Sequence, residues 1–264
     1  MSSLRDRFFE HRKLDDCPIY DLHSHMGPFF GAHLPWCDPD AAIRAMDQAN
    51  VRMLVFCHHA AIFSPDIGNS SNIEAVRKHP DKFRAYCAIN PNYPDIIEKD
   101  LQSYDEYPDV FFGLKFHGEF HEISITHDRN TPAWEFANDR SLPVLIHTWD
   151  GSSFDGEQQV REVAERYPNA KLLLGHSIHG AWKAAAHLAK YSPNVYLDLC
   201  AVLDDRGALE IIVEESGSEK LFFGTDFPWF EFHYYIGAIL GADISDEDRR
   251  NIFYRNAQRL LGID

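Results

Sequence analysis

Regular alternation of short apolar segments with helix-like patterns constrains the fold of this chain more than any other feature. Several of the apolar segments are nearly continuous rather than interrupted by polar residues, as expected for parallel strands that are buried on both faces. The eight expected strands span residues 19–22, 53–56, 83–89, 110–116, 144–146, 171–174, 195–199 and 220–223. Eight strand–helix units spaced by about 30 residues are what a closed parallel barrel requires.

Helix signals lie between these strands. Apolar residues recur along one helical face over residues 160–167, and Asp38 followed by Pro39 is typical of a helix start. Ser245 with Asp248 three residues later resembles a capping box for a last helix over 246–261. The sequence therefore predicts an α/β fold, a single (β/α)8 TIM barrel.

The domain organisation follows from the length and from the absence of any break in the pattern. A chain of 264 residues with 45% hydrophobic residues can fill one barrel core, and no internal repeat or linker divides it. We expect one domain over residues 1–264. A doubly wound open sheet is the alternative, but no GxGxxG motif follows the first strand.

Charge and cysteine content limit the partners. Acidic residues outnumber basic ones by 41 to 25, a net charge of −16, which disfavours nucleic acid and anionic membranes. No apolar run approaches the roughly 20 residues of a membrane span, and residues 1–16 lack a signal-peptide core. Five cysteines without a CxxC pair suit reduced thiols. We expect a cytoplasmic enzyme with a small-molecule substrate, and a homo-oligomer is compatible with the sequence.

Metal-binding residues gather where the expected strands end. The first strand leads into His23-Ser24-His25, and since strand residues alternate faces, the two imidazoles project to one side. Asp21, on the same face, could orient one of the rings. An HxH pair is a weak signal when it occurs alone.

Three further strands repeat this placement. The fifth ends at His147, the sixth at His176 and the eighth at Asp226. The carboxyl ends of barrel strands form the mouth in which active sites lie, so chance coincidence is a poor explanation for four such strands. Three or four nitrogen and oxygen ligands with an open position are typical of a catalytic Zn²⁺, Mn²⁺ or Fe²⁺ site.

These residues resemble the amidohydrolase superfamily of metal-dependent hydrolases. Residues 223–228, Phe-Gly-Thr-Asp-Phe-Pro, are similar to its strand-eight signature, especially in the amidohydrolase-2 branch that includes non-oxidative decarboxylases. Residues 256–261, Asn-Ala-Gln-Arg-Leu-Leu, resemble the C-terminal helix of that branch. The resemblance covers nearly the whole chain.

The resemblance implies a role for each of these positions. His23 and His25 would bind the metal, and Asp226 would be both a ligand and the proton-accepting base. His147 would be a fourth ligand of one ion or would bind a second ion. His176 would bind that second ion or act as a catalytic acid and base. The divalent ion is expected to be Zn²⁺, with Mn²⁺ or Fe²⁺ also compatible.

Strand four decides how many ions are expected. Lys115 and His117 share one face there, and both are candidates for substrate binding. In two-metal members of the superfamily a lysine on this strand is carboxylated and bridges the ions, whereas a cationic Lys115 could anchor a substrate carboxylate. Without a carboxylated lysine, two ions would repel each other, so one ion is favoured over two.

The loops supply candidate substrate contacts. The segment over residues 26–36 is apolar for an exposed loop, and with Trp149, Phe227 and Trp229 it could wall an apolar pocket. Simple packing of the loop onto the barrel is the alternative. His58, His59 and His121 could line the same mouth, and the alternative is that most of these histidines lie on the surface.

Three functions remain open at this point. The first is hydrolysis of an ester, lactone or amide of a small molecule by a metal-activated water, with Asp226 as the base. The second is non-oxidative decarboxylation of an aromatic or unsaturated carboxylic acid, in which His176 and Asp226 manage the protons. The third, a non-catalytic metal-binding barrel, is disfavoured because every group needed for chemistry is present. Hydrolysis is our first expectation.

Overall fold

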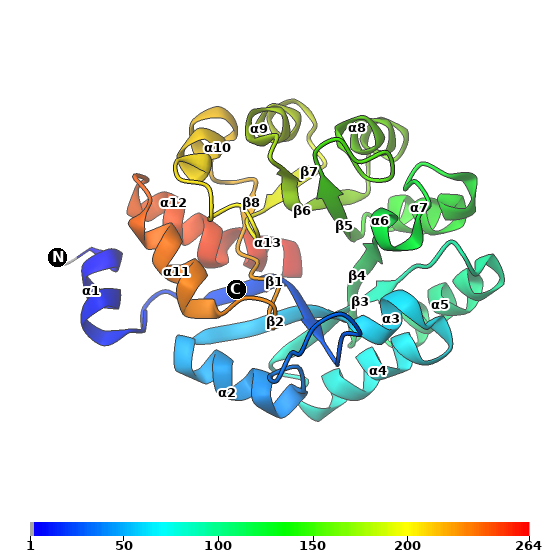
Figure 1. Ribbon diagram of the computed structural model, residues 1–264, viewed down its shortest axis with the longest axis horizontal. Helices are drawn as coiled ribbons and strands as arrows, with labels where there is room; N and C mark the ends of the chain where they lie inside the picture. Colours follow the sequence, from blue (N-terminus) through cyan, green and yellow to red (C-terminus); the bar gives the residue numbers. More distant parts are fainter. Residues whose placement is uncertain (1–2, 264) are drawn as a thin grey trace.

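Eight parallel strands form one sheet in the order β1 to β8, surrounded by helices, in a computed structural model that describes residues 3–263 apart from the side chains of residues 65 and 66 (Figure 1). The strands are β1 (Ile19–Met26), β2 (Val51–His58), β3 (Phe83–Ala88), β4 (Phe111–Phe116), β5 (Pro143–Trp149), β6 (Lys171–His179), β7 (Val195–Asp198) and β8 (Leu221–Phe222). The predicted (β/α)8 barrel is confirmed.

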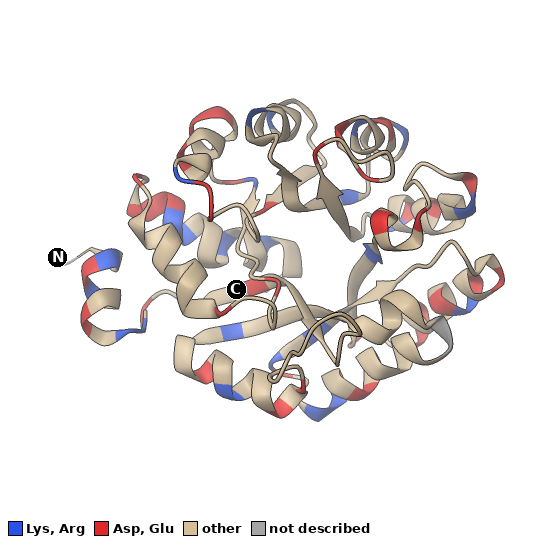
Figure 2. Ribbon diagram, in the orientation of Figure 1, with Lys and Arg blue, Asp and Glu red and all other residues tan. Residues whose placement is uncertain are grey.

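Helices cover the outside of the sheet. They are α1 (Leu4–His11), α2 (Pro39–Ala49), α3 (His59–Phe63), α4 (Pro65–Lys78), α5 (Pro94–Glu106), α6 (Gly118–His121), α7 (Thr131–Asp139), α8 (Glu157–Arg166), α9 (Trp182–Tyr191), α10 (Ala208–Ser216), α11 (Phe232–Gly241), α12 (Asp246–Arg250) and α13 (Asn256–Leu261). Within residues 3–263 no helix is both long enough and apolar enough to cross a membrane. Charged residues lie mainly on the helices and the loops around the barrel (Figure 2).

The expected helix starts are present. The Asp38 side chain accepts a hydrogen bond from the Ala41 amide, and Ser245 and Asp248 form a capping box. The last helix is not a continuous α-helix, however, because a π-helical segment, Asn251–Arg255, separates α12 from α13.

Four strands, β1, β2, β5 and β6, extend further than their predicted apolar segments. β1 continues through His25 to Met26, and β6 continues through His176 to His179, because residues near their ends still pair with neighbouring strands. His25 pairs with Cys57 of β2, for example. The metal-binding candidates of these strands therefore lie inside the sheet, where the backbone fixes their direction.

The barrel closes between its shortest strand and β1. β8 has only two residues, but the chain after it runs beside β1 and is joined to it by backbone hydrogen bonds. The Leu22 amide donates to Phe223 O at 3.0 Å, and the Asp226 amide donates to His23 O at 2.8 Å. This seam places Asp226 directly beside the His23–His25 segment.

Candidate metal centre

Three side chains meet at the seam. His25 Nε2 lies 3.1 Å from Asp226 Oδ1, and His23 Nε2 lies 3.5 Å from the same oxygen. The ligand atoms of the three residues are all within 4.8 Å of one another. Both histidines are buried, and Asp226 is largely covered. The convergence expected for His23, His25 and Asp226 is thus present in the structure.

Hydrogen bonds orient the two imidazoles. His23 Nδ1 is 2.8 Å from Asp198 Oδ2, and His25 Nδ1 is 3.0 Å from the Cys57 carbonyl oxygen. Since both partners are acceptors, each ring carries its proton on Nδ1 and leaves the Nε2 lone pair facing Asp226. Protein metal sites commonly hold histidine ligands in this way.

Asp226 is held in an uncommon backbone conformation and is ionised. Its φ angle is 61°, in the left-handed region that is rare outside glycine and that recurs at functional sites. Burial acts to raise the pKa of Asp226, but a hydrogen bond from protonated His25 and the positive charges of protonated His23 and His25 outweigh it and hold the pKa well below its ordinary value. A bound metal ion would take the place of these protons and keep the carboxylate ionised.

This donor group fits a divalent metal ion. Two Nε2 lone pairs and an ionised carboxylate converge in a buried place, and this mixed nitrogen–oxygen set suits first-row divalent ions. Asp198 Oδ1, behind the His23 ring, is buried and has no hydrogen-bond partner. The unpaired negative charge of this carboxylate would be balanced by a cation bound to His23.

His147 lies in a separate group. Its Nδ1 is 3.1 Å from Asp155 Oδ2, and its ring stacks on His117 with centroids 4.2 Å apart. His117, His147 and Asp155 form one cluster of potential ligands, and His23, His25 and Asp226 form another. His147 faces the same cavity as the second cluster. Its role as a fourth ligand of the same ion stays a prediction.

His176 borders the donor group from β6. Its ring centroid is 5.1 Å from that of His23, and its Nδ1 is 2.9 Å from the Cys200 sulfur. Burial, and then the charge of His147, hold the pKa of His176 well below its ordinary value. An uncharged imidazole beside the metal ligands can accept a proton, as the predicted acid–base role requires.

Lys115 points into the same space. Its Nζ lies 3.2 Å from His23 Nε2, and burial lowers its pKa. Within residues 3–263 no carboxylate forms an ion pair with this amine. The amine is therefore available to an anionic partner, and both of its predicted forms, the cationic anchor and the carbamate, stay open.

One cavity of about 290 Å³ is lined by the His23–His25–Asp226 group together with His147, His176 and Lys115. Aromatic and apolar side chains wall the cavity around the polar ones. The lining consists of His23, His25, Phe29, His59, Ile62, Lys115, His117, Phe120, His147, Trp149, His176, Ala201, Asp226, Trp229 and Phe230. The predicted substrate contacts Lys115, His117 and Trp149 are among them.

Phe227 does not belong to this wall. Its ring is buried and stacks on Phe232, with centroids 4.8 Å apart, because the chain turns Phe227 towards α11 after Asp226. The apolar loop over residues 26–36 contributes Phe29, whereas Phe30 is exposed. His59 does line the cavity, and it accepts a hydrogen bond from Trp229 Nε1 at 3.1 Å.

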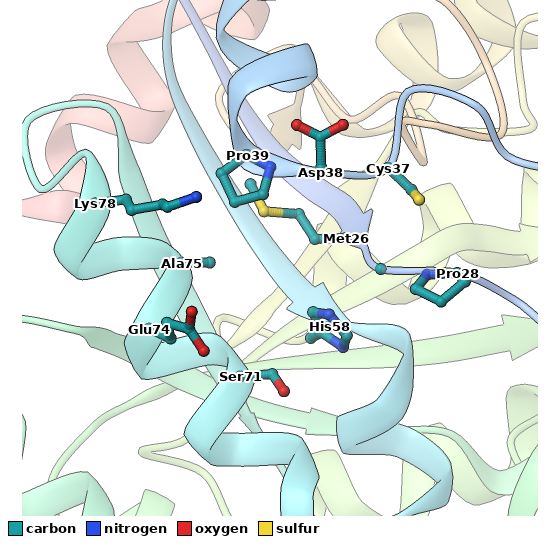
Figure 3. A pocket seen from close by; sticks show the side chains of 11 residues that line it. Met26, Pro28, Cys37, Asp38, Pro39, His58, Ser71, Glu74, Ala75 and Lys78 are labelled. Atoms are coloured by element: carbon teal, nitrogen blue, oxygen red, sulfur yellow. The ribbon is translucent and has the colours of Figure 1, made fainter.

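A second cavity, of about 260 Å³, lies between the ends of β1 and β2 and helix α4 (Figure 3). Its polar lining includes His58, Glu74 and Lys78, and the last two are exposed. The two cavities are similar in size, so size does not show which of them is the functional site. Among the described residues, buried side chains that could hold a metal ion converge only at the first cavity, which is therefore the candidate site. His58 lines this second cavity rather than the first, and His121 is buried with Nε2 2.8 Å from the Ile62 carbonyl oxygen and does not line the first cavity either.

Sequence reasoning missed three residues. Asp198 and Cys200 at the end of β7 contact His23 and His176, and Asp155 contacts His147. Asp198 is also a potential metal ligand at the end of a strand, so the criterion that selected His147, His176 and Asp226 could have found it. Asp155 lies in a loop and carries no such signal.

The sequence suggested that Asp21 orients one of the histidine rings, but in the structure Asp198 orients His23. Its carboxylate instead accepts hydrogen bonds from the His23 amide at 2.9 Å and from the Thr225 hydroxyl at 2.5 Å. It therefore supports the backbone at the seam.

The fold and these residues define a (β/α)8-barrel protein with a histidine–aspartate group at its mouth that is a candidate metal-binding site. The sequence profile of the family described as Amidohydrolase matches residues 21–263, so the chain belongs to the amidohydrolase family. The resemblance inferred from the sequence is confirmed.

Known proteins similar to this chain include several decarboxylases. Gamma-resorcylate decarboxylase from Polaromonas sp. is 21% identical over 287 residues, 85% of this chain and 87% of that protein. The structure of 2,6-dihydroxybenzoate decarboxylase from Rhizobium has a TM-score of 0.73 at 16% identity and covers 94% of this chain and 99% of its own. That of 5-carboxyvanillate decarboxylase from Novosphingobium aromaticivorans, with bound manganese, has a TM-score of 0.74 at 12% identity and covers 94% and 97%. The two structures confirm the fold.

Proposed function

We propose that this protein is a metal-dependent non-oxidative decarboxylase of a small aromatic carboxylic acid. The observation that carries the proposal is a single cavity in which a His–His–Asp donor group, a further histidine and a buried lysine meet among aromatic side chains. Hydrolysis, our first expectation from the sequence, becomes the second candidate. Both reactions suit the family, but the relatives described above are decarboxylases.

His23, His25 and Asp226 would hold the divalent ion, with His147 as the predicted fourth ligand. The ion would supply a positive charge that binds and polarises the oxygen atoms of the substrate. Manganese is the first ion to test, because it is bound in the related 5-carboxyvanillate decarboxylase. No observation favours zinc specifically.

Decarboxylation exchanges the carboxylate for a proton. The bond between the ring carbon and the carboxylate breaks, CO₂ leaves, and the electron pair of that bond is taken up by a proton at the carbon. Asp226 and His176 both border the cavity, so they are positioned to hold and deliver that proton.

Lys115 would anchor the substrate. Lys115 is the one lysine or arginine among the described residues that line the cavity. The negative charge of an incoming carboxylate would favour the protonated form of the lysine amine. His117 and Trp149 would border the substrate ring, since both line the cavity and their rings lie parallel to the His147 ring, with centroids 4.2 Å and 6.0 Å from it.

A parallel substrate test separates the two reactions. The protein loaded with Mn²⁺ is incubated in deuterated water with 2,6-dihydroxybenzoate, with 5-carboxyvanillate, and with a panel of esters and lactones. We expect CO₂ release matched by a product that carries solvent deuterium at the vacated carbon. Asp226→Asn should lower kcat by about 10²–10⁴-fold, whereas Asp100→Asn, a buried carboxylate outside the cavity, should not. Ester or lactone cleavage without any CO₂ release would contradict the proposal and restore hydrolysis.

A further inference from the structure

Two histidines at the barrel mouth are held in the same way. His23 Nδ1 lies 2.8 Å from Asp198 Oδ2, and His147 Nδ1 lies 3.1 Å from Asp155 Oδ2. Both carboxylates are buried, and in both the second oxygen, Oδ1, has no hydrogen-bond partner. His23 belongs to the metal-binding group, so the same arrangement at His147 points to the same use of its ring.

The loop that carries Asp155 is built for close approach. The amide of Asp155 donates to Ser152 Oγ at 3.2 Å, and Asp155 Oδ2 accepts from the Glu119 amide at 3.3 Å. A Cβ atom at Gly118 would come within 3.1 Å of Oδ2 and 3.0 Å of Phe154 Cβ. A side chain at position 118 would therefore press on the loop after β5 that seats Asp155 behind His147.

Asp155 has no basic partner other than this histidine. It is fully buried, and within residues 3–263 no lysine or arginine forms an ion pair with it. A buried carboxylate without a cation is costly. With the proton of His147 on Nδ1, the Nε2 lone pair lies on the opposite side of the ring, where a bound cation would balance Asp155 through the imidazole.

An ion held between His117, His147 and Asp155 is a less suitable alternative. His117 Nδ1 already accepts a hydrogen bond from the Phe120 amide at 3.3 Å. His117 and His147 line the cavity, but Asp155 does not.

We infer that Asp155 is a positioning residue: it holds His147 with Nε2 towards the cavity and strengthens this nitrogen as a ligand for the divalent ion. The inference rests on the metal centre of the proposed function. Asp155 lies outside the cavity, so it would influence metal binding only through its hydrogen bond to the His147 ring.

Metal affinity of the full chain tests this without any substrate. Mn²⁺ binding is measured by competition with a chelator for the wild type, Asp155→Asn and Asp155→Ala. Loss of such a partner typically weakens metal binding by about 10–100-fold. We expect this loss in both variants, smaller in Asp155→Asn, whose amide oxygen can still accept from Nδ1. Asp100→Asn, which removes a buried carboxylate that is hydrogen-bonded to Asn69 rather than to a histidine, should bind Mn²⁺ like the wild type.

Nitrogen-15 NMR of the metal-free wild type gives a second readout that does not depend on how a variant folds. We expect His147 to carry its proton on Nδ1. Protonation on Nε2, or unchanged Mn²⁺ affinity in both Asp155 variants or in His147→Ala, would overturn the inference. Weakened Mn²⁺ binding in a protein that releases no CO₂ would instead contradict the proposed function and leave the role of Asp155 standing.

Discussion

Gly224 shows how closely the chain must approach itself around the donor group. A Cβ atom at this position would lie 1.8 Å from Asp198 Oδ1 and 2.9 Å from His23 Cβ. Asp198 orients His23, and Asp226 follows Gly224 by two residues. The missing side chain therefore lets β7, β1 and the segment after β8 meet at one point.

Replacing Gly224 with alanine should disturb both stability and metal binding. The added methyl group has to displace the buried Asp198 carboxylate or the β-carbon of His23, and overpacking of this kind costs about 1–3 kcal/mol. We expect a lower Tm and weaker Mn²⁺ binding, measured by thermal unfolding and chelator competition.

Gly237 in α11 is a matched control. A Cβ atom there would have open space, and alanine is favoured over glycine in helices by up to about 1 kcal/mol. Gly237→Ala should keep wild-type Mn²⁺ affinity and an equal or higher Tm. Wild-type metal affinity in Gly224→Ala would show that Asp198 is not confined as the structure indicates.

Helices α4 and α5 are fastened to β3 by a buried polar network. Asn69 of α4 donates to Ala88 O at 3.1 Å and to Asp100 Oδ1 of α5 at 2.8 Å, and it accepts from the Ala88 amide at 2.9 Å. Burial raises the pKa of Asp100 to about 6, although the hydrogen bond from Asn69 opposes the rise. The folded protein thus binds the Asp100 proton more tightly than the unfolded chain does.

Asp100→Asn should therefore stabilise the protein in a pH-dependent way. The raised pKa gives Asp100 a favourable contribution below about pH 4, its unfolded pKa, and this contribution is lost as the pH rises through about 6. The asparagine variant has no carboxylate to ionise. We expect the unfolding free energy of the variant to exceed that of the wild type by an amount that grows by on the order of 2 kcal/mol between pH 4 and 7. The difference in Tm should grow over the same pH range.

Asp105 of the same helix supplies the comparison. It is exposed and pairs with Arg140 on the surface, so Asp105→Asn should change stability little. Parallel Tm profiles for the wild type and Asp100→Asn from pH 4 to 8 would mean that the Asp100 carboxylate is not buried at a cost.

The barrel depends on its seam, where the first strand meets the segment that follows the last strand. β8 is short, and backbone hydrogen bonds join the segment after it to β1. His23 and His25 lie on one side of this seam and Asp226 lies on the other. A metal ion held by all three would tie together parts of the chain that are about 200 residues apart in sequence.

Metal removal should lower the stability of the entire barrel. Mn²⁺ at 100 times its Kd adds about 2.7 kcal/mol, which corresponds to a rise in Tm of about 5–10 °C for a chain of this size. We expect the Tm to rise with the free Mn²⁺ concentration and to fall again when a chelator is added, while metal analysis finds one equivalent of Mn²⁺ per chain. A second equivalent, with a carbamate signal on Lys115 after incubation with carbon-13 bicarbonate, would show that two ions bind.

Much of the fold follows from local patterns in the chain. Apolar runs of strand length and helix starts such as Asp38 depend on neighbouring residues alone, so the strand–helix alternation is legible in the sequence. The carboxyl ends of all strands in a parallel barrel meet at one mouth, so His23, His25, His176 and Asp226 could be grouped before their contacts were known. The ligand types at these strand ends predicted the metal, and the family motifs added the reaction classes.

The partners of these side chains depended on the folded barrel. Asp198 rather than Asp21 orients His23, because strand twist and the seam decide which carboxylate reaches the ring. Asp155 approaches His147 from a loop whose conformation no local periodicity encodes. Phe227 turns into the core although it follows Asp226 directly. Each of these contacts joins segments that are distant in sequence or set by loop geometry, and hydrogen bonds have to match within a few tenths of an ångström. Residue patterns select the elements, whereas that precision arises only when the elements pack.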